Sequence, residues 1–243
     1  MYPKRYLRWP SVEQFDGAQF ELACERFQDG LLGQPANAVT SLAFVLAAGL
    51  VATGVGTGRR GSVRRRWPYA ALVLAVGVGS LVQHGPHPPW QAYAHDLPLA
   101  TLLAFVAADA AADLWGRRGY RWWLAVPVVM VPVVMAGPAV SSLTQGLLAA
   151  VAIGLNLARA RARPQLRRTL FRALAVLATG ALLGSLTDRT QLCAPESLWQ
   201  GHAAWHVLAA AALWLLAPAI GACDAARSRP GVEGAERPSA AVG

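Results

Sequence analysis

The feature that most constrains this chain is a series of seven apolar runs joined by short polar connections. The runs cover about residues 37–56, 68–85, 97–115, 122–136, 139–158, 170–187 and 198–222. A helix of about 20 apolar residues crosses the ~30 Å hydrocarbon core of a bilayer, and only the fourth run is marginal in length. The sequence therefore predicts an all-α integral membrane protein, a bundle of seven transmembrane helices.

The composition agrees with a membrane protein. Hydrophobic residues make up 55% of the 243-residue chain and charged residues only 14%, whereas soluble domains carry about 25% charged residues. The net charge of +9 raises the question of nucleic-acid binding. Because the basic residues gather in the connections between apolar runs, we attribute the charge to membrane topology and expect no nucleic-acid partner.

The arginines predict how the bundle is oriented. The first, third and fifth connections together carry thirteen, whereas the second and fourth carry no basic residue and the sixth carries only Arg189. Positive loops stay in the cytoplasm, so the N-terminus is predicted outside and the C-terminus inside. This divides the chain into an extracytoplasmic segment (1–36), a transmembrane domain (37–223) and a disordered cytoplasmic tail (224–243). Arginine far outnumbers lysine and alanine is abundant, which indicates a GC-rich bacterial genome, so the protein is expected in the inner membrane of a bacterium.

The fourth run contains Pro127 and Pro132, which would kink a helix. Two interpretations stay open: an irregular but well-packed helix, or a bent wall that opens a lateral path for lipid.

All five histidines fall near predicted outer helix ends or in the outer loop between the second and third runs. Ser80 and His84 are four residues apart, as are His202 and His206, so each pair shares one helix face. Three histidines from two helices, with a water as fourth ligand, form the donor set of a catalytic zinc site. His84, His202 and His206 are therefore the predicted metal ligands, with Asp96 at the same depth. His87 and His95 are expected to lie at the membrane–water interface without binding the metal.

Asp109 and Asp113 lie deeper along the third run. A structural ion pair with Arg117, Arg118 or another loop arginine is preferred over a second site.

These patterns together resemble the alkaline ceramidase family, seven-helix membrane hydrolases in the superfamily that includes the adiponectin receptors. The resemblance rests on Ser80-x-x-x-His84, on Asp96 before Leu-Pro, and on His202-x-x-x-His206 in the last run. Further similarity lies in Cys24-Glu25, in the segment 34–42, and in Asp188, Cys193 and the run 201–206. It covers nearly all of the chain outside the C-terminal tail.

The resemblance implies that His84, His202 and His206 bind Zn²⁺. Asp96 would orient or deprotonate the attacking water, and Ser80 would help to stabilise the oxyanion. The substrate would be the amide of a membrane lipid with a long acyl chain, reached from the periplasmic face. Two alternatives stay open: a Ser80 nucleophile with His84 as its base, and a non-enzymatic lipid receptor or sensor with a structural zinc. The oligomeric state is not predicted.

The resemblance also implies a disulfide between Cys24 and Cys193, with a pair of free thiols as the alternative, whereas Cys223 would be free. Some family members bind Ca²⁺ through acidic residues of the N-terminal segment. Glu25 is retained here, but Gln34 and Leu22 occupy positions where acids are expected, which argues against Ca²⁺. Glu25 is expected instead to hydrogen-bond Asn37 and brace the helix end.

Overall fold

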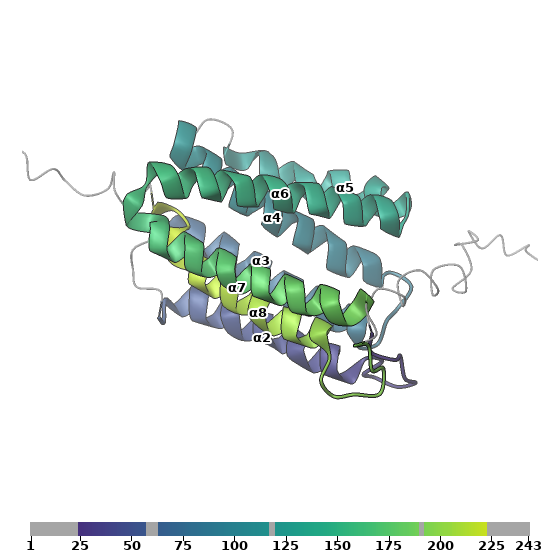
Figure 1. Ribbon diagram of the computed structural model, residues 1–243. Helices are drawn as coiled ribbons and strands as arrows, with labels where there is room; N and C mark the ends of the chain where they lie inside the picture. Colours follow the sequence, from purple (N-terminus) through teal and green to yellow (C-terminus); the bar gives the residue numbers. More distant parts are fainter. Residues whose placement is uncertain (1–23, 57–62, 117–119, 190–191, 223–243) are drawn as a thin grey trace, which may run out of the picture.

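The structure is a computed structural model that describes residues 24–56, 63–116, 120–189 and 192–222 (Figure 1). These residues contain helices and no strand. The α-helices are α2 (Pro35–Thr53), α3 (Val63–His84), α4 (Gln91–Trp115), α5 (Val126–Met135), α6 (Pro138–Ala162), α7 (Pro164–Arg189) and α8 (Gly201–Leu216), with 3₁₀ helices η1 (Tyr120–Ala125) and η2 (Ala217–Ala219). The predicted all-helical class is confirmed for this part of the chain. The region before Cys24, the C-terminal tail and Cys223 lie outside the described residues.

Five stretches are long and apolar enough to cross a membrane: α2, α4, α6, α7 and α8 with η2. Helix α3 has 22 residues, but three arginines follow Val63 in its first turn. The fourth apolar run does not form one helix. It begins as the 3₁₀ helix η1 and continues as α5, which has only 10 residues. The bundle is thus compatible with a multi-pass membrane protein, while the count of seven spans stays a prediction.

The helix boundaries lie close to the predicted ones, with two informative differences. Helix α2 begins at Pro35, inside the segment assigned to the extracytoplasmic tail, because Pro35 occupies the first turn, where no backbone N–H is needed. The change from η1 to α5 falls immediately before Pro127, whose ring cannot donate a backbone hydrogen bond. The fourth run is therefore interrupted near Pro127, whereas Pro132 lies inside α5.

Counting η1 and α5 as one segment, successive helical segments from α2 to α8 run in alternating directions, so the bundle has two distinct polar ends. At one end the start of α2 meets the end of α3, where the Gln34 backbone N–H donates to the His84 carbonyl (2.7 Å). The loop before α8 lies at this same end, whereas η2 lies at the opposite one (Figure 1). The histidines of α3 and α8 therefore share one end of the bundle, and the arginines at the start of α3 and the end of α6 share the other.

A buried ion network holds the arginine end together. Arg159 donates to Asp109 (3.0 Å) and to Asp113 (2.7 Å), and Arg65 also donates to Asp109 (2.7 Å). Arg163 contacts Asp113 from a half-exposed position. The predicted structural ion pairing is confirmed, and its partners come from α3 and α6. Arg117 and Arg118, which were also considered, lie outside the described residues.

The same network fixes the segment that follows α8. The Gly221 N–H donates to Asp109 Oδ1 (3.0 Å), and Arg159 donates to the Ala219 carbonyl (2.6 Å). Arg159 is only 1% exposed, so its charge depends on these partners. The network ties α3, α4, α6 and η2 to one another and thereby sets the positions of the helices that carry the histidines.

Candidate metal centre

Three histidines meet at the end of the bundle opposite the ion network. His84 ends α3, while His202 and His206 lie one turn apart at the start of α8, so the i, i+4 spacing brings both imidazoles to one face. One ring nitrogen from each histidine lies within 4.8 Å of the other two. His84 and His206 are buried, and His202 is half-buried. Among the described residues this is the only group of three or more His, Cys, Asp or Glu side chains with that geometry.

Hydrogen bonds on the outer side of the cluster orient two of the rings. His84 Nδ1 donates to Gln34 Oε1 (2.6 Å), and His206 Nδ1 donates to the Asn37 carbonyl (3.1 Å). With the proton on Nδ1, each Nε2 carries a lone pair. The Nε2 of His84 is buried and has no hydrogen-bond partner among the described residues. Metal-binding histidines have this arrangement, in which one nitrogen is held by an acceptor and the other is left for the metal.

The residues present therefore fit a metal ion. A buried imidazole nitrogen without a partner costs free energy, and coordination would remove that cost. Neutral imidazoles suit zinc and several other transition metals, so the cluster by itself does not specify the ion. The predicted ligand set of His84, His202 and His206 is brought together as expected.

Ser80 lies beside the cluster, one turn before His84. Its Oγ is 3.4 Å from His206 Nε2 and 2.9 Å from Ser41 Oγ, and both serines are almost fully buried. Ser41 also donates to the Asn37 carbonyl (2.8 Å), so Ser80 can donate to Ser41 or turn toward the cluster. The structure thus places Ser80 where the sequence predicted, supported by a second serine from α2.

The carboxylate of Asp96 is engaged by two side chains outside the histidine cluster. Its Oδ1 accepts from His95 Nδ1 (2.7 Å), and its Oδ2 accepts from Ser141 Oγ on α6 (2.6 Å). Asp96 does not belong to the group of metal-ligand atoms. His95, expected to be a bystander, instead lines the cavity described below together with Gln145. The loop is shorter than the sequence suggested, because α4 begins at Gln91 and His95 therefore lies inside the helix.

His87 is the other histidine expected to wet the interface. It lies between α3 and α4, and its ring packs edge-on against Phe27. It is not one of the three clustered histidines.

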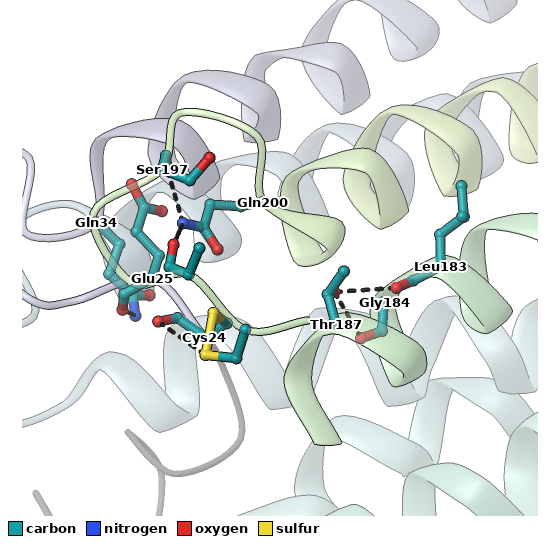
Figure 2. Close-up of a disulfide and its surroundings, with 10 residues drawn as sticks. Cys24, Glu25, Gln34, Leu183, Gly184, Thr187, Ser197 and Gln200 are labelled. Atoms are coloured by element: carbon teal, nitrogen blue, oxygen red, sulfur yellow. Dashed lines mark hydrogen bonds between the residues drawn. A yellow bond between two sulfur atoms is a disulfide. The ribbon is translucent and has the colours of Figure 1, made fainter. Parts of the chain in front are cut away.

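A disulfide ties the N-terminal segment to the loop before α8. Cys24 is bonded to Cys193, the pairing that the resemblance implied (Figure 2). Next to it, the Glu25 carbonyl accepts from Gln34 Nε2 (2.7 Å), and Gln34 in turn holds His84. The segment is thus connected from the disulfide to the metal centre by consecutive contacts.

These residues do not fit a calcium site. The two carboxylate oxygens of Glu25 accept from the backbone N–H groups of Ala36 (2.7 Å) and Asn37 (2.9 Å) at the start of α2. The expected bond between Glu25 and Asn37 is therefore present, and it braces the helix end as a capping carboxylate. Gln34 directs its carbonyl oxygen at His84. Calcium prefers six to eight oxygen ligands, several of them carboxylates, and the described residues around Glu25 gather no such set.

A cavity of about 400 Å³ opens beside the histidines and continues between α4, α6, α7 and α8. Polar side chains line its outer end: Ser80, Gln83, His95, Gln145, His202 and His206. The rest of the lining is apolar, mostly alanine, valine and leucine together with Phe44 and Trp205, except for Asn156. Volumes of 300–1,000 Å³ with mostly apolar walls are typical of small-molecule sites.

Sequence reasoning missed four residues of this site: Gln34 as the partner of His84, Ser41 as the partner of Ser80, and His95 and Ser141 as the partners of Asp96. Of these, only Ser41 could have been noticed in the sequence, because it lies four residues after Asn37 and therefore on the same face of α2.

The chain matches no protein-family model and no curated protein sequence.

Proposed function

We propose that this protein is a zinc-dependent hydrolase that cleaves the amide bond of an N-acyl lipid within the membrane. One observation carries the proposal: a buried cluster of three histidines lies at the polar mouth of a deep apolar cavity. The cluster supplies a metal centre, and the cavity suits a long acyl chain. Placed together, they put the amide of such a lipid beside the metal.

His84, His202 and His206 would hold the zinc. When bound, zinc lowers the pKa of a coordinated water to about 7 and polarises a carbonyl oxygen, which is the chemistry that amide hydrolysis needs. Gln34 and the Asn37 carbonyl keep the imidazoles in their metal-binding tautomer. Ser80 Oγ would donate a hydrogen bond to the carbonyl oxygen of the substrate as negative charge develops on it.

Proton transfer would pass through His95 and Asp96. His95 lines the cavity, and its Nδ1–H donates to Asp96, so its Nε2 is available to accept a proton. His95 would take the proton of the attacking water and deliver it to the leaving amine, while Asp96 stabilises the charged ring. Asp96, proposed from the sequence as the proton-handling group, would thus act through its neighbour. Ser141 keeps the carboxylate in place.

The membrane arrangement follows from the charge distribution. With the arginine end in the cytoplasm, the histidine end faces the periplasm of a bacterial inner membrane. Helix α3 and the η1–α5 segment would be the two further spans that bring the total to seven. The lipid would enter its site from the outer leaflet.

The first test measures metal. The purified full-length protein is expected to carry about one zinc per chain, and His206→Ala to carry almost none. If the wild type holds no stoichiometric metal, the proposal fails.

The second test measures hydrolysis. N-acyl lipids with different head groups are incubated with the wild type, and the release of fatty acid and free amine is followed. We expect both products from at least one class, and rates at least 100-fold lower for Asp96→Ala and His95→Ala. A protein that holds zinc, hydrolyses none of these lipids and is unaffected by Asp96→Ala would instead be a lipid sensor with a structural metal.

A further inference from the structure

The cavity beside the metal centre is polar at both ends. Its outer end carries the histidines and Gln145, and its inner end carries Asn156 on α6. Between them the walls are apolar side chains from α4, α6, α7 and α8. A plain hydrocarbon chain would match the middle of this cavity but not its inner end.

Asn156 has an unsatisfied acceptor at that inner end. The side chain is 4% exposed, and its Nδ2 donates to the Ala152 carbonyl one turn earlier (2.9 Å). This bond fixes the orientation of the amide, because the opposite orientation would bring two oxygens together. The Oδ1 atom is buried and has no hydrogen-bond partner among the described residues. Buried carbonyl oxygens are almost always hydrogen-bonded, so this one points to a ligand that carries a donor.

The depth of Asn156 matches the length of one acyl chain. At ~1.5 Å per residue, the helix rise from Gln145 to Asn156 is about 16 Å. Half of a ~30 Å hydrocarbon core, the space that the chains of one leaflet fill, is about 15 Å. A straight chain with its amide beside the histidines would therefore place its far end near Asn156.

We propose that Asn156 forms an inner subsite that selects acyl chains carrying a hydroxyl group near their far end. The hydroxyl would donate to Asn156 Oδ1, while the rest of the chain lies against apolar walls. A water is a poorer occupant, because a buried water needs two to four polar partners and the surrounding walls are apolar. The placement of the amide at the histidines rests on the proposed function. The subsite itself rests on Asn156 and the cavity.

The test is a binding competition that needs no hydrolysis. Straight-chain fatty acids of increasing length and their ω-hydroxy counterparts displace a radiolabelled fatty acid from the full-length protein in nanodiscs. Both series carry the same carboxylate, so any contribution of the metal centre cancels within each matched pair. We expect the ω-hydroxy acid to bind about five- to tenfold more tightly at one chain length and to show little advantage at shorter lengths.

Two variants connect this preference to Asn156. Asn156→Leu keeps the volume but removes the acceptor, and it is expected to abolish the preference without lowering the melting temperature. Ile153→Leu changes the shape of the same wall without changing its polarity, and the preference should persist. Equal binding of the two series by the wild type, or an unchanged preference in Asn156→Leu, would overturn the subsite. So would failure of both series to bind.

The two proposals can fail separately. A hydroxyl preference in a protein that hydrolyses no N-acyl lipid would leave the subsite standing and remove the enzyme. Hydrolysis without any hydroxyl preference would support the enzyme and overturn the subsite.

Discussion

Gln34 joins the N-terminal segment to the metal centre with one side chain. Its Nε2 donates to the Glu25 carbonyl, and its Oε1 accepts from His84 Nδ1. Glutamine can do both because its amide offers a donor and an acceptor, which a carboxylate cannot. Gln34 stands where an acidic residue was expected for a calcium site. In the structure its side chain instead holds His84 in the tautomer that can bind a metal.

Replacing Gln34 by leucine should weaken metal binding. The variant keeps the volume but leaves His84 Nδ1 without its acceptor, and loss of such a partner typically lowers metal affinity 10- to 100-fold. Zinc affinity is measured by competition with a chromogenic chelator. Gln34→Glu restores an acceptor for His84 and is expected to recover most of the affinity.

The matched control is Gln28→Leu, the same change at an exposed position of the same segment. It should bind zinc like the wild type. Equal zinc affinities for Gln34→Leu and Gln28→Leu would contradict the positioning role of Gln34.

The candidate site was predictable from the sequence only where local spacing and helix direction determine it. The spacing of His202 and His206 required no tertiary information, and alternating helices brought His84 to the same end. The partners of Asp96 could not be found in this way. Ser141 comes from α6, and its contact with Asp96 depends on how α4 and α6 are rotated against each other.

At the scale of helix pairs, Gly79 sets the distance between α3 and α4. A Cβ at this position would collide with the Ala94 backbone carbonyl, which cannot move aside as a side chain could. Small residues allow such close approaches between membrane helices. The neighbouring residues Ser80 and His95 belong to the site, so this approach also sets its width.

Gly79→Ala should therefore destabilise the protein and separate Ser80 from His95. A lower melting temperature in detergent and reduced zinc content are expected. Gly154→Ala serves as the control, because an added Cβ on this exposed face of α6 meets no atom within 4 Å. Alanine is the better helix former, so this variant should be as stable as the wild type or slightly more so. Equal melting temperatures for the two variants would show that α3 and α4 can move apart without loss of stability, and would contradict the role of Gly79.

The ion network gives a second prediction about helix packing. Arg159→Met removes a buried cation that contacts both Asp109 and Asp113, and breaking a buried pair in this way costs about 3–5 kcal/mol. Arg163→Met removes a cation whose side chain is 42% exposed, for which about 1 kcal/mol or less is expected. Denaturant unfolding in mixed micelles compares the two. Similar losses for both would mean that burial of Arg159 does not determine its contribution.

At the scale of the whole molecule, the order and approximate limits of the helices were readable from hydropathy, because lipid-facing and core residues are both apolar. The only sign in the sequence of the break between η1 and α5 was the pair of prolines in the fourth apolar run. Which arginines meet Asp109 and Asp113 was not readable, since several loop arginines lie within reach in sequence. The structure places the histidine cluster at one end of the bundle and Arg65 and Arg159, with their aspartate partners, at the other.

Orientation is therefore the prediction that belongs to the whole molecule. Ser197 lies in the loop at the histidine end, and Ala162 ends α6 at the arginine end. Single cysteines are introduced at these positions in a Cys223→Ala background, and intact spheroplasts are treated with a membrane-impermeant maleimide. Because positive loops stay in the cytoplasm, Ser197→Cys should be labelled at once and Ala162→Cys only after permeabilisation. The reverse pattern would place the metal centre toward the cytoplasm, and labelling of both in intact spheroplasts would contradict a bundle that crosses the membrane between these ends.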